Sequence, residues 1–234
     1  MNIFRLLGDM SHLASILILL HQIQTSRSSR GVSILSRTKK ALQRMLSPAP
    51  PGISFKTQAL YVAVFLTRYI DLFTFHFVSL YNTFMKIFFI GSSIYILYLM
   101  KFKYRPTNDP SIDTFKIEYL LGPSVVLALI FNYGFIFSEV LWAFSIYLEA
   151  VAIFPQLFML QRTGEAEAIT THYIAALGAY RALYVPNWIY RYWTEGSVDP
   201  IAVLAGLVQT GLYIDFFYVY FTRVVKGEKF ELPA

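Results

Sequence analysis

Residues 138–160 read SEVLWAFSIYLEAVAIFPQLFML, and this stretch decides the fold class. It is long enough to cross a bilayer as a helix, which takes about 20 predominantly apolar residues. After Glu139 its only charged residue is Glu149, and Pro155 predicts a kink near the end of the helix. An ionised side chain at membrane depth is costly in lipid, so we expect Glu149 to face the interior of a helical bundle.

Six further apolar stretches complete the pattern. They cover residues 3–20, 58–75, 83–100, 115–131, 173–192 and 200–221. Together the seven predict an all-α membrane protein with seven transmembrane helices, in a single domain over residues 1–234. The composition agrees, because 56% of the residues are hydrophobic and 15% are charged, whereas soluble domains have about a quarter charged. The first stretch has no small-residue cleavage site after it, so we expect a retained helix.

The residue inventory narrows the chemistry. Cysteine is absent, which excludes disulfides and thiol catalysis. The four histidines are His12, His21, His76 and His172, and none stands at a metal-ligand spacing. No GxSxG or HExxH motif occurs, so we expect neither an enzyme nor a bound metal or cofactor.

Basic residues lie almost entirely on one side of the predicted topology. Of the 20 Lys and Arg, 15 fall in alternate loops and the C-terminal segment. The other five lie within predicted spans: Arg5, Arg68, Lys86, Arg181 and Arg191. By the positive-inside rule, the basic loops and the C-terminus are cytosolic and the N-terminus is lumenal. This asymmetry accounts for the net charge of +6 without a nucleic-acid partner.

Ionisable and aromatic residues share helix faces in two of the stretches. Arg5, Asp9 and His12 are spaced four and three apart and therefore lie on one face. A second stripe contains Arg181, Tyr184, Trp188 and Arg191, bordered by Tyr180 and Asn187. One interpretation is an interior cavity whose arginines bind a ligand with several carboxylates, with Asp71 and Glu139 receiving a cation of that ligand. The other is that these charges pair with one another and hold the helices together.

Two of these residues each allow a second interpretation. His12 has the ionisation range of a pH switch in an acidic compartment, but a lone histidine in a helix also serves as a hydrogen-bonded packing residue. Trp188 suits either a cation–π contact or the interfacial aromatic belt.

Several segments carry a resemblance to a known family. They are MNIFRLLGDMSHLASILILL (1–20), LTRYIDLF (66–73), SLYNTFMK (79–86), DTFKIEYL (113–120), the run from WAFSIYLEA to NWIYRY (142–192) and DFFYVYFTRVVKGEKFELPA (215–234). Over nearly the whole chain the sequence resembles the endoplasmic reticulum (ER) lumenal protein retaining receptors, the KDEL receptors. The resemblance implies two triple-helix bundles like those of PQ-loop transporters and sugar porters. The dipeptide Pro155-Gln156 resembles the signature of those transporters, which leaves a small-solute transporter as the alternative function.

The resemblance also implies a function. Receptors of this family capture escaped lumenal proteins in the acidic Golgi by their C-terminal Lys/His-Asp-Glu-Leu signal. They then recruit the retrograde COPI vesicle coat and release cargo at the neutral pH of the ER. The implied localisation is therefore the ER and Golgi membranes, with membrane lipid as a further partner.

Roles for individual residues follow from the resemblance. For signal binding it implies Arg5, Arg68, Asp71, Glu139, Tyr184, Asn187, Trp188 and Arg191. Arg68 would take the terminal carboxylate, and Arg5 and Arg191 the Glu and Asp side chains. For pH sensing and gating it implies His12, Glu149, Tyr180, Arg181, Asp199 and Asp215. For coat recruitment it implies Arg223, Lys226 and Lys229 in the basic tail at about 222–234.

The first basic loop departs from the family pattern. Residues at about 33–53 look like an insertion, bracketed by a near repeat of Val-Ser and Ile-Ser. Within it, residues 35–46 could form a basic amphipathic helix or a disordered polar loop. Two origins remain open, a lineage-specific cytosolic loop and an unspliced intron translated in frame.

Overall fold

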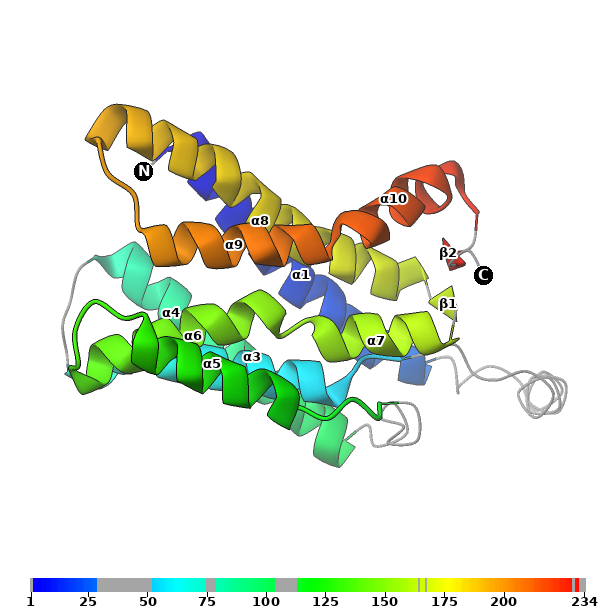
Figure 1. Cartoon of the computed structure of the whole chain (residues 1–234). Coiled ribbons are helices and arrows are strands. Elements are labelled where there is room, and N and C mark those ends of the chain that lie inside the picture. The colour runs from blue at the N-terminus through cyan, green and yellow to red at the C-terminus, as the bar shows by residue number, and fades with distance from the viewer. Residues whose placement is uncertain are drawn as a thin grey trace, which may run out of the picture.

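The structure is a computed structural model that describes residues 2–28, 52–74, 79–103, 113–163, 165–166, 168–228 and 230–231. The predicted insertion at about 33–53 lies almost entirely outside the described residues, as does Lys229. Apart from the connecting loops, the described part consists of helices and one short strand pair, β1 (Glu165–Ala166) with β2 (Phe230–Glu231). Figure 1 shows the helices side by side, with the two chain ends at opposite ends of the molecule.

Each predicted apolar stretch lies in one helix or in two consecutive ones. In chain order these are α1 (Ile3–Ser28), α3 (Phe55–Arg68) with η2 (Ile70–Thr74), α4 (Leu80–Tyr98) with η3 (Leu99–Lys103), α5 (Glu118–Ile130), α6 (Phe137–Val151) with α7 (Phe154–Thr163), α8 (Ala168–Glu195), and α9 (Pro200–Leu212) with α10 (Ile214–Thr222). A last 3-10 turn, η5, spans Val224–Lys226. The sequence thus predicted the helices, although it placed their ends up to eight residues away.

Polar side chains and prolines set several helix ends. Ser54 and Ser79 accept the backbone N–H of Thr57 and Asn82, which caps α3 and α4. Asp199 caps α9, whose first residue is Pro200. The predicted kink at Pro155 is confirmed, because α6 ends at Val151 and α7 begins at Phe154. Proline cannot donate to the carbonyl four residues earlier, and its ring clashes with it.

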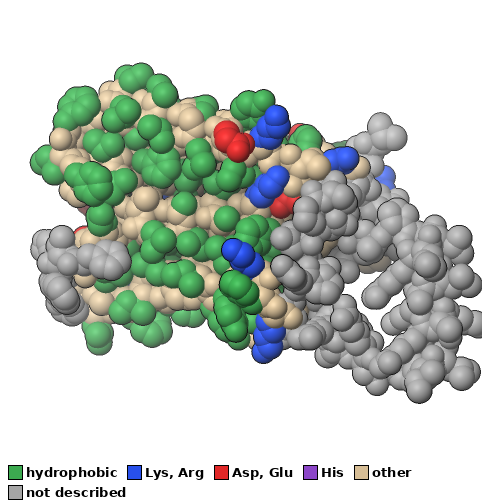
Figure 2. Space-filling view, turned by 90° about the horizontal axis from the view of Figure 1, so that it is seen from below, with side chains coloured by type: hydrophobic (Ala, Val, Ile, Leu, Met, Phe, Trp, Pro, Cys, Tyr) green, Lys and Arg blue, Asp and Glu red, His purple; other side chains and the backbone are tan. Residues whose placement is uncertain are grey.

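Four parts of the described chain have the length and composition of membrane spans. Three are single helical segments, Ile3–Gln24, Leu80–Lys103 and Phe137–Arg162. The fourth is the pair Pro200–Leu212 and Ile214–Lys226, bent by 41° at the break. Figure 2 shows hydrophobic side chains over most of one outer face, with Lys and Arg toward one end. The described helices are accordingly compatible with a multi-pass membrane protein; seven spans and two triple-helix bundles stay predictions.

Helix packing brings the polar stripes together. The most extensive contact is between α1 and α8, which carry the two predicted stripes, and α6 packs against α3, α5 and α9. The large apolar core includes Val64 and Leu148, both fully buried. The site described below lies where α1, α3, α6 and α8 meet.

Candidate functional site

A fully buried carboxylate, Glu149, is the centre of the candidate site. Arg68, the last residue of α3, and Arg181, on α8, both form ion pairs with it. The Arg181 Nη2 atom lies 2.6 Å from Glu149 Oε2. Tyr180, next to Arg181, donates its hydroxyl hydrogen to Glu149 Oε1. Two guanidinium groups on one carboxylate leave this group of four residues with one excess positive charge.

Neutral side chains hold both guanidinium groups in place. Arg68 Nε donates to Ser145 Oγ and Arg68 Nη2 to the Ser145 carbonyl, each at 3.1 Å. Arg181 Nε donates to Gln209 Oε1 at 2.5 Å, which ties the group to α9. Because a guanidinium has five donors in a fixed plane, these contacts orient it as well as bind it. We refer to Glu149, Arg68, Arg181, Tyr180, Ser145 and Gln209 as the inner cluster.

His12 lies against the inner cluster through ring contacts. Its imidazole is buried and stacks on the Tyr180 ring, with centroids 4.3 Å apart and planes inclined by 12°. The Phe89 ring also stacks on it, with centroids 4.5 Å apart. A proton gained or lost by His12 would therefore change the charge directly beside the tyrosine that donates to Glu149.

A second set of charged pairs lies nearer the surface. Arg5 is 4.0 Å from Asp9, Arg191 is 2.6 Å from Glu195, and Lys86 forms an ion pair with Asp71. Asp9 also accepts hydrogen bonds from Tyr184 at 2.8 Å and from Tyr81 at 3.0 Å. We call these three pairs the outer pairs. Roughly half of the Arg5 and Arg191 side chains is exposed, at 49% and 44%.

The remaining predicted signal-binding residues lie on α8 and at the start of α6. Asn187 accepts a hydrogen bond from Asn2 at 2.8 Å, which joins α8 to the beginning of α1. Trp188 is buried and packs directly on Gly206 of α9, where a Cβ atom would overlap its six-membered ring. Glu139 is partly exposed in the first turn of α6.

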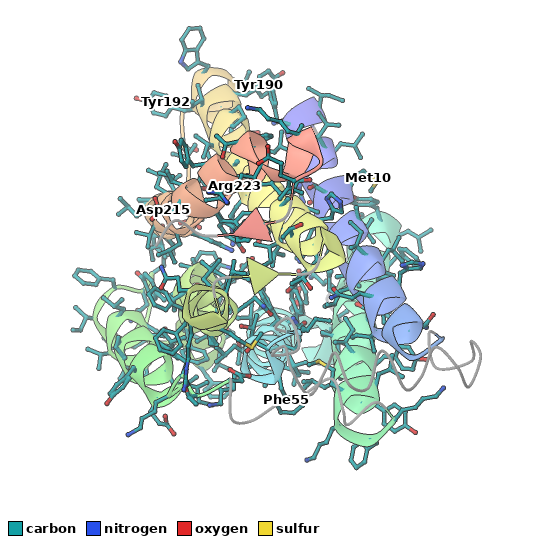
Figure 3. The ribbon with its side chains drawn as sticks, turned by 90° about the vertical axis from the view of Figure 1, so that its right-hand side faces the viewer. Met10, Phe55, Tyr190, Tyr192, Asp215 and Arg223 are labelled. Atoms are coloured by element: carbon teal, nitrogen blue, oxygen red, sulfur yellow. The ribbon has the colours of Figure 1, made fainter. Side chains whose placement is uncertain are left out.

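Two of the residues predicted for pH sensing and gating have no contact with the inner cluster. Asp199 caps α9 and accepts a hydrogen bond from Tyr133 at 2.8 Å. Desolvation, helped by this carboxylate, raises the pKa of Tyr133 to about 12. Asp215 is exposed in the first turn of α10 (Figure 3). The structure therefore brings together His12, Glu149, Tyr180 and Arg181 of this predicted set.

The predicted coat-recruiting residues lie where the chain leaves the bundle. Arg223 follows α10 directly, and Lys226 ends η5 before Gly227, whose φ is 83°. Figure 3 views the molecule from this end and shows Arg223 on the α10 side of the bundle. A short β pair, Ala166 with Phe230, attaches the tail to the segment between α7 and α8.

The dipeptide that suggested a transporter has a structural role here. Gln156 Oε1 accepts the Ser54 backbone N–H at 2.7 Å, and its own backbone N–H donates to Thr57 Oγ1 at 3.0 Å. Asp113 accepts from the Ser54 hydroxyl at 2.9 Å. Gln156 therefore joins α7 to the first turn of α3.

The sequence missed several residues of the site. Ser145 is one helical turn before Glu149, and Gln209 is a lone amide in an apolar helix, so both could have been found as polar residues on buried faces. Glu195 could have been found from its four-residue spacing to Arg191 on one helix. Lys86 could have been matched to Asp71 by opposite charge only once the helix neighbours are known. All four arginines are paired, but only Arg68 and Arg181 pair between helices, as the alternative of charges that hold the helices together requires. Arg5 and Arg191 each pair with an acid four residues later on the same helix.

Comparison with known proteins gives one consistent result. A family model described as "ER lumen protein retaining receptor" matches residues 50–191. The chain is 53% identical to an ER lumen protein-retaining receptor of Caenorhabditis briggsae. It is 53% identical to ER lumen protein-retaining receptor 2 of Gallus gallus and 51% identical to the receptor of Saccharomyces cerevisiae. Each of these alignments covers all of both chains.

Proposed function

Because the chain belongs to the family of ER lumen protein-retaining receptors, which are receptors and not enzymes, we propose that it binds the C-terminal Lys/His-Asp-Glu-Leu signal of lumenal proteins. We propose further that it does so in the acidic Golgi and returns its cargo to the ER in COPI-coated vesicles. The single observation that best supports a carboxylate ligand is the excess of guanidinium over carboxylate around Glu149.

Three arginines would hold the signal by exchanging carboxylates. Arg5, Arg68 and Arg191 now pair with Asp9, Glu149 and Glu195, and a bound signal would offer its terminal, Glu and Asp carboxylates instead. Arginine suits this exchange, because it stays charged and binds carboxylates through two parallel hydrogen bonds. Arg68 would receive the terminal carboxylate, since it is the deepest of the three, with 15% of its side chain exposed.

The first residue of the signal would lie among acids and an indole. Asp71, Glu139 and Trp188 would receive its positive charge, by ion pairing and by a cation–π contact. Tyr184 and Asn187, one turn apart from each other on α8, would line the same pocket. Asp71 would then exchange Lys86 for the ligand cation.

His12 would couple this binding to pH. Its proton would add a positive charge beside a cluster that already has an excess of positive charge, and a ligand carboxylate would offset that charge. If ligand binding takes up a proton in this way, linkage requires the affinity to rise as the pH falls. Tyr180 and Arg181 would pass the change to α9 through Gln209, and Asp199 and Asp215 would act in the movement of the last helices.

A binding assay tests the signal and its pH dependence together. The purified receptor is titrated with a labelled peptide ending in His-Asp-Glu-Leu, as the free acid and as the C-terminal amide, near pH 5.5 and near pH 7.4. We expect tight binding of the free acid near pH 5.5 and weak binding of the other three combinations. Equal or absent binding at both pH values would overturn the proposal, and solute uptake in liposomes would then test the transporter alternative.

Two histidine variants make the pH dependence specific. His12→Asn removes the buried imidazole, and we expect it to abolish the difference in affinity between the two pH values. His172→Asn is the matched control, because His172 is exposed on α8 and contacts Tyr220 at 2.8 Å, away from the inner cluster. A lost difference in both variants, or in neither, would contradict a sensor at His12.

The tail and the insertion carry two smaller proposals. Arg223, Lys226 and Lys229 would bind the coat, and Arg223→Lys would strengthen coat binding if the coat prefers lysine, since the two side chains are not interchangeable. The insertion at about 33–53 would be either a cytosolic loop or an artefact of splicing. Sequencing the transcript separates the two, because a message without this stretch eliminates the loop.

A further inference from the structure

A pocket outside the candidate site lies between α5, α6 and α9. Its volume is about 280 Å³, close to the lower end of the usual range for ligand pockets. Two residues from each helix define its walls: Tyr119 and Leu127 of α5, Tyr147 and Val151 of α6, and Leu204 and Val208 of α9. No residue of the inner cluster or of the outer pairs lines it.

Helix packing explains why the pocket exists. Both α5 and α9 pack on α6 (Figure 1), but they share few contacts with each other, so α6 forms the floor of the pocket between them. The side chains at the bottom are small, among them Ser124, Ala150 and Ala205. The floor ends at Val151, where Pro155 interrupts the helix.

The walls of the pocket favour a hydrocarbon ligand over a polar one. The Ser124 hydroxyl donates to the Leu120 carbonyl at 2.7 Å, and the Tyr147 hydroxyl donates to the Phe131 carbonyl at 3.1 Å. Both are therefore already engaged within the protein and do not offer their hydrogens to a ligand. A polar solute would lose its hydrogen bonds with water on entering, whereas an alkyl chain would not.

The pocket opens on the apolar outer surface. Leu204 is 65% exposed and Val208 56% exposed, although both form its wall. The outward-facing residues beside them, such as Val126 and Leu207, are apolar and exposed too. In a bilayer the medium that reaches this opening is lipid.

A cation lies at one end of the pocket. Lys116 is exposed, and its carbonyl accepts the backbone N–H of Tyr119, so it lies one turn from the pocket wall. The neighbouring cations have protein partners: Lys56 Nζ donates to the Phe115 carbonyl at 2.8 Å, and Arg162 donates to Thr114 at 2.7 Å. Among the described residues Lys116 forms no ion pair. The exposed Glu118 reduces the local positive charge but leaves the Lys116 ammonium available.

We propose that this pocket holds one acyl chain of an anionic phospholipid, with its negatively charged headgroup beside Lys116. The chain fills the groove between α5 and α9 and completes the packing around the interrupted helix α6. The headgroup lies at the basic end of the bundle, where Lys and Arg gather (Figure 2).

Photolabelling tests the occupant. The full-length receptor is placed in nanodiscs that contain phosphatidylserine with a diazirine in one acyl chain, and labelled peptides are identified by mass spectrometry. We expect labelling on the wall residues of α5, α6 and α9. Leu127→Trp and Val208→Trp enlarge exposed wall positions and should lower this labelling several-fold, while the thermal midpoint confirms that each variant folds.

Matched controls and a headgroup variant complete the test. Val126→Trp and Leu207→Trp are exposed neighbours that do not line the pocket, and they should label like the wild type. Lys116→Gln should lower the preference for phosphatidylserine over a matched phosphatidylcholine probe about fivefold, which corresponds to one basic residue near a membrane surface. Equal loss in wall and control variants, or no loss in either, would overturn the acyl-chain site. An unchanged lipid preference in Lys116→Gln would overturn the headgroup contact.

Discussion

The inner cluster and the outer pairs use the same chemistry in different surroundings. In both, a basic side chain binds a carboxylate, yet Glu149 is fully buried whereas Glu195 is half exposed. In the inner cluster two arginines share one carboxylate, and each has a further neutral partner, Ser145 or Gln209. In each outer pair, one basic residue faces one acid.

This difference in burial separates two tasks. Removing one member of a buried pair leaves an uncompensated charge away from water, which destabilises a protein strongly. Breaking an exposed pair costs little, because water and salt already screen it. A ligand carboxylate can thus displace the outer carboxylates readily. If the terminal carboxylate takes Arg68 as proposed, Glu149 still pairs with Arg181 and holds α6 against α8. The four predictions below test in turn a buried charge, a close packing contact, a buried neutral hydrogen bond and an exposed charge.

The largest effect should follow the loss of buried charge. Glu149→Gln keeps the shape of the side chain but leaves Arg68 and Arg181 facing each other without an anion. We expect the free energy of unfolding to fall by about 3–5 kcal/mol, measured by denaturation in detergent. Gln209→Leu is a control that removes a neutral partner of Arg181 and should cost less. A smaller loss for Glu149→Gln than for Gln209→Leu would contradict the comparison.

The second largest loss of stability should follow a change in the packing contact between Gly206 and Trp188, which involves shape and no charge. In Gly206→Ala the new methyl group would overlap the Trp188 ring and force the indole to move. We expect a loss of about 1–3 kcal/mol, typical of overpacking, and weaker binding of the first signal residue. Gly211→Ala is the matched control on the same helix, because a Cβ there meets no atom within 4 Å. A similar loss in both variants would show that helix α9, and not the Trp188 contact, is sensitive.

Loss of a buried hydrogen bond between uncharged groups should lower the stability less. Gln156→Leu removes the acceptor of the Ser54 backbone N–H at the start of α3. One buried donor left without a partner costs about 1–2 kcal/mol, again measured by denaturation. Because Gln156 lies outside the inner cluster, we expect peptide affinity to keep its pH dependence. A changed pH dependence would show that the α3–α7 junction takes part in gating.

The sequence was sufficient to predict where the helices lie, but not which residues contact one another between helices. Hydrophobic stretches and Pro155 located the elements, and the four- and three-residue spacing placed Arg5 and Asp9 on one face. The break between α9 and α10 at Tyr213 was not predicted, since no proline or glycine stands at that position. Tyr213 is fully buried and lies against Gly178 of α8. That bend depends on a tertiary contact, which a local pattern does not contain.

The same limit applies to the site. The stripe on α8 correctly marked Arg181 as an interior residue, but its periodicity does not say that α6 supplies the carboxylate and α9 the amide. Asp71 follows Arg68 by three residues, yet Asp71 pairs with Lys86 and Arg68 pairs with Glu149. The pairing partners were decided by which helices are neighbours.

Removal of the exposed charge of Glu195 should have the smallest effect on stability of the four changes. Glu195 lies at the end of α8, beyond the predicted span, and the hydrogen bonds from Arg191 lower the pKa of its carboxyl group. Its contribution to stability is therefore present above the unfolded value of about 4.3 and is lost only as the pH falls through the lower folded value. Between pH 5.5 and 7.4 the group stays ionised.

Glu195→Gln should accordingly leave the thermal midpoint unchanged, and with it the ratio of peptide affinities at the two pH values. Absolute affinity should rise slightly at both, because Arg191 no longer has an internal carboxylate to exchange. Titration of the labelled peptide near pH 5.5 and near pH 7.4 measures both quantities, with His12→Asn as the variant that should change the ratio. A changed ratio in Glu195→Gln would place an exposed pair within the pH response and remove the distinction between inner cluster and outer pairs.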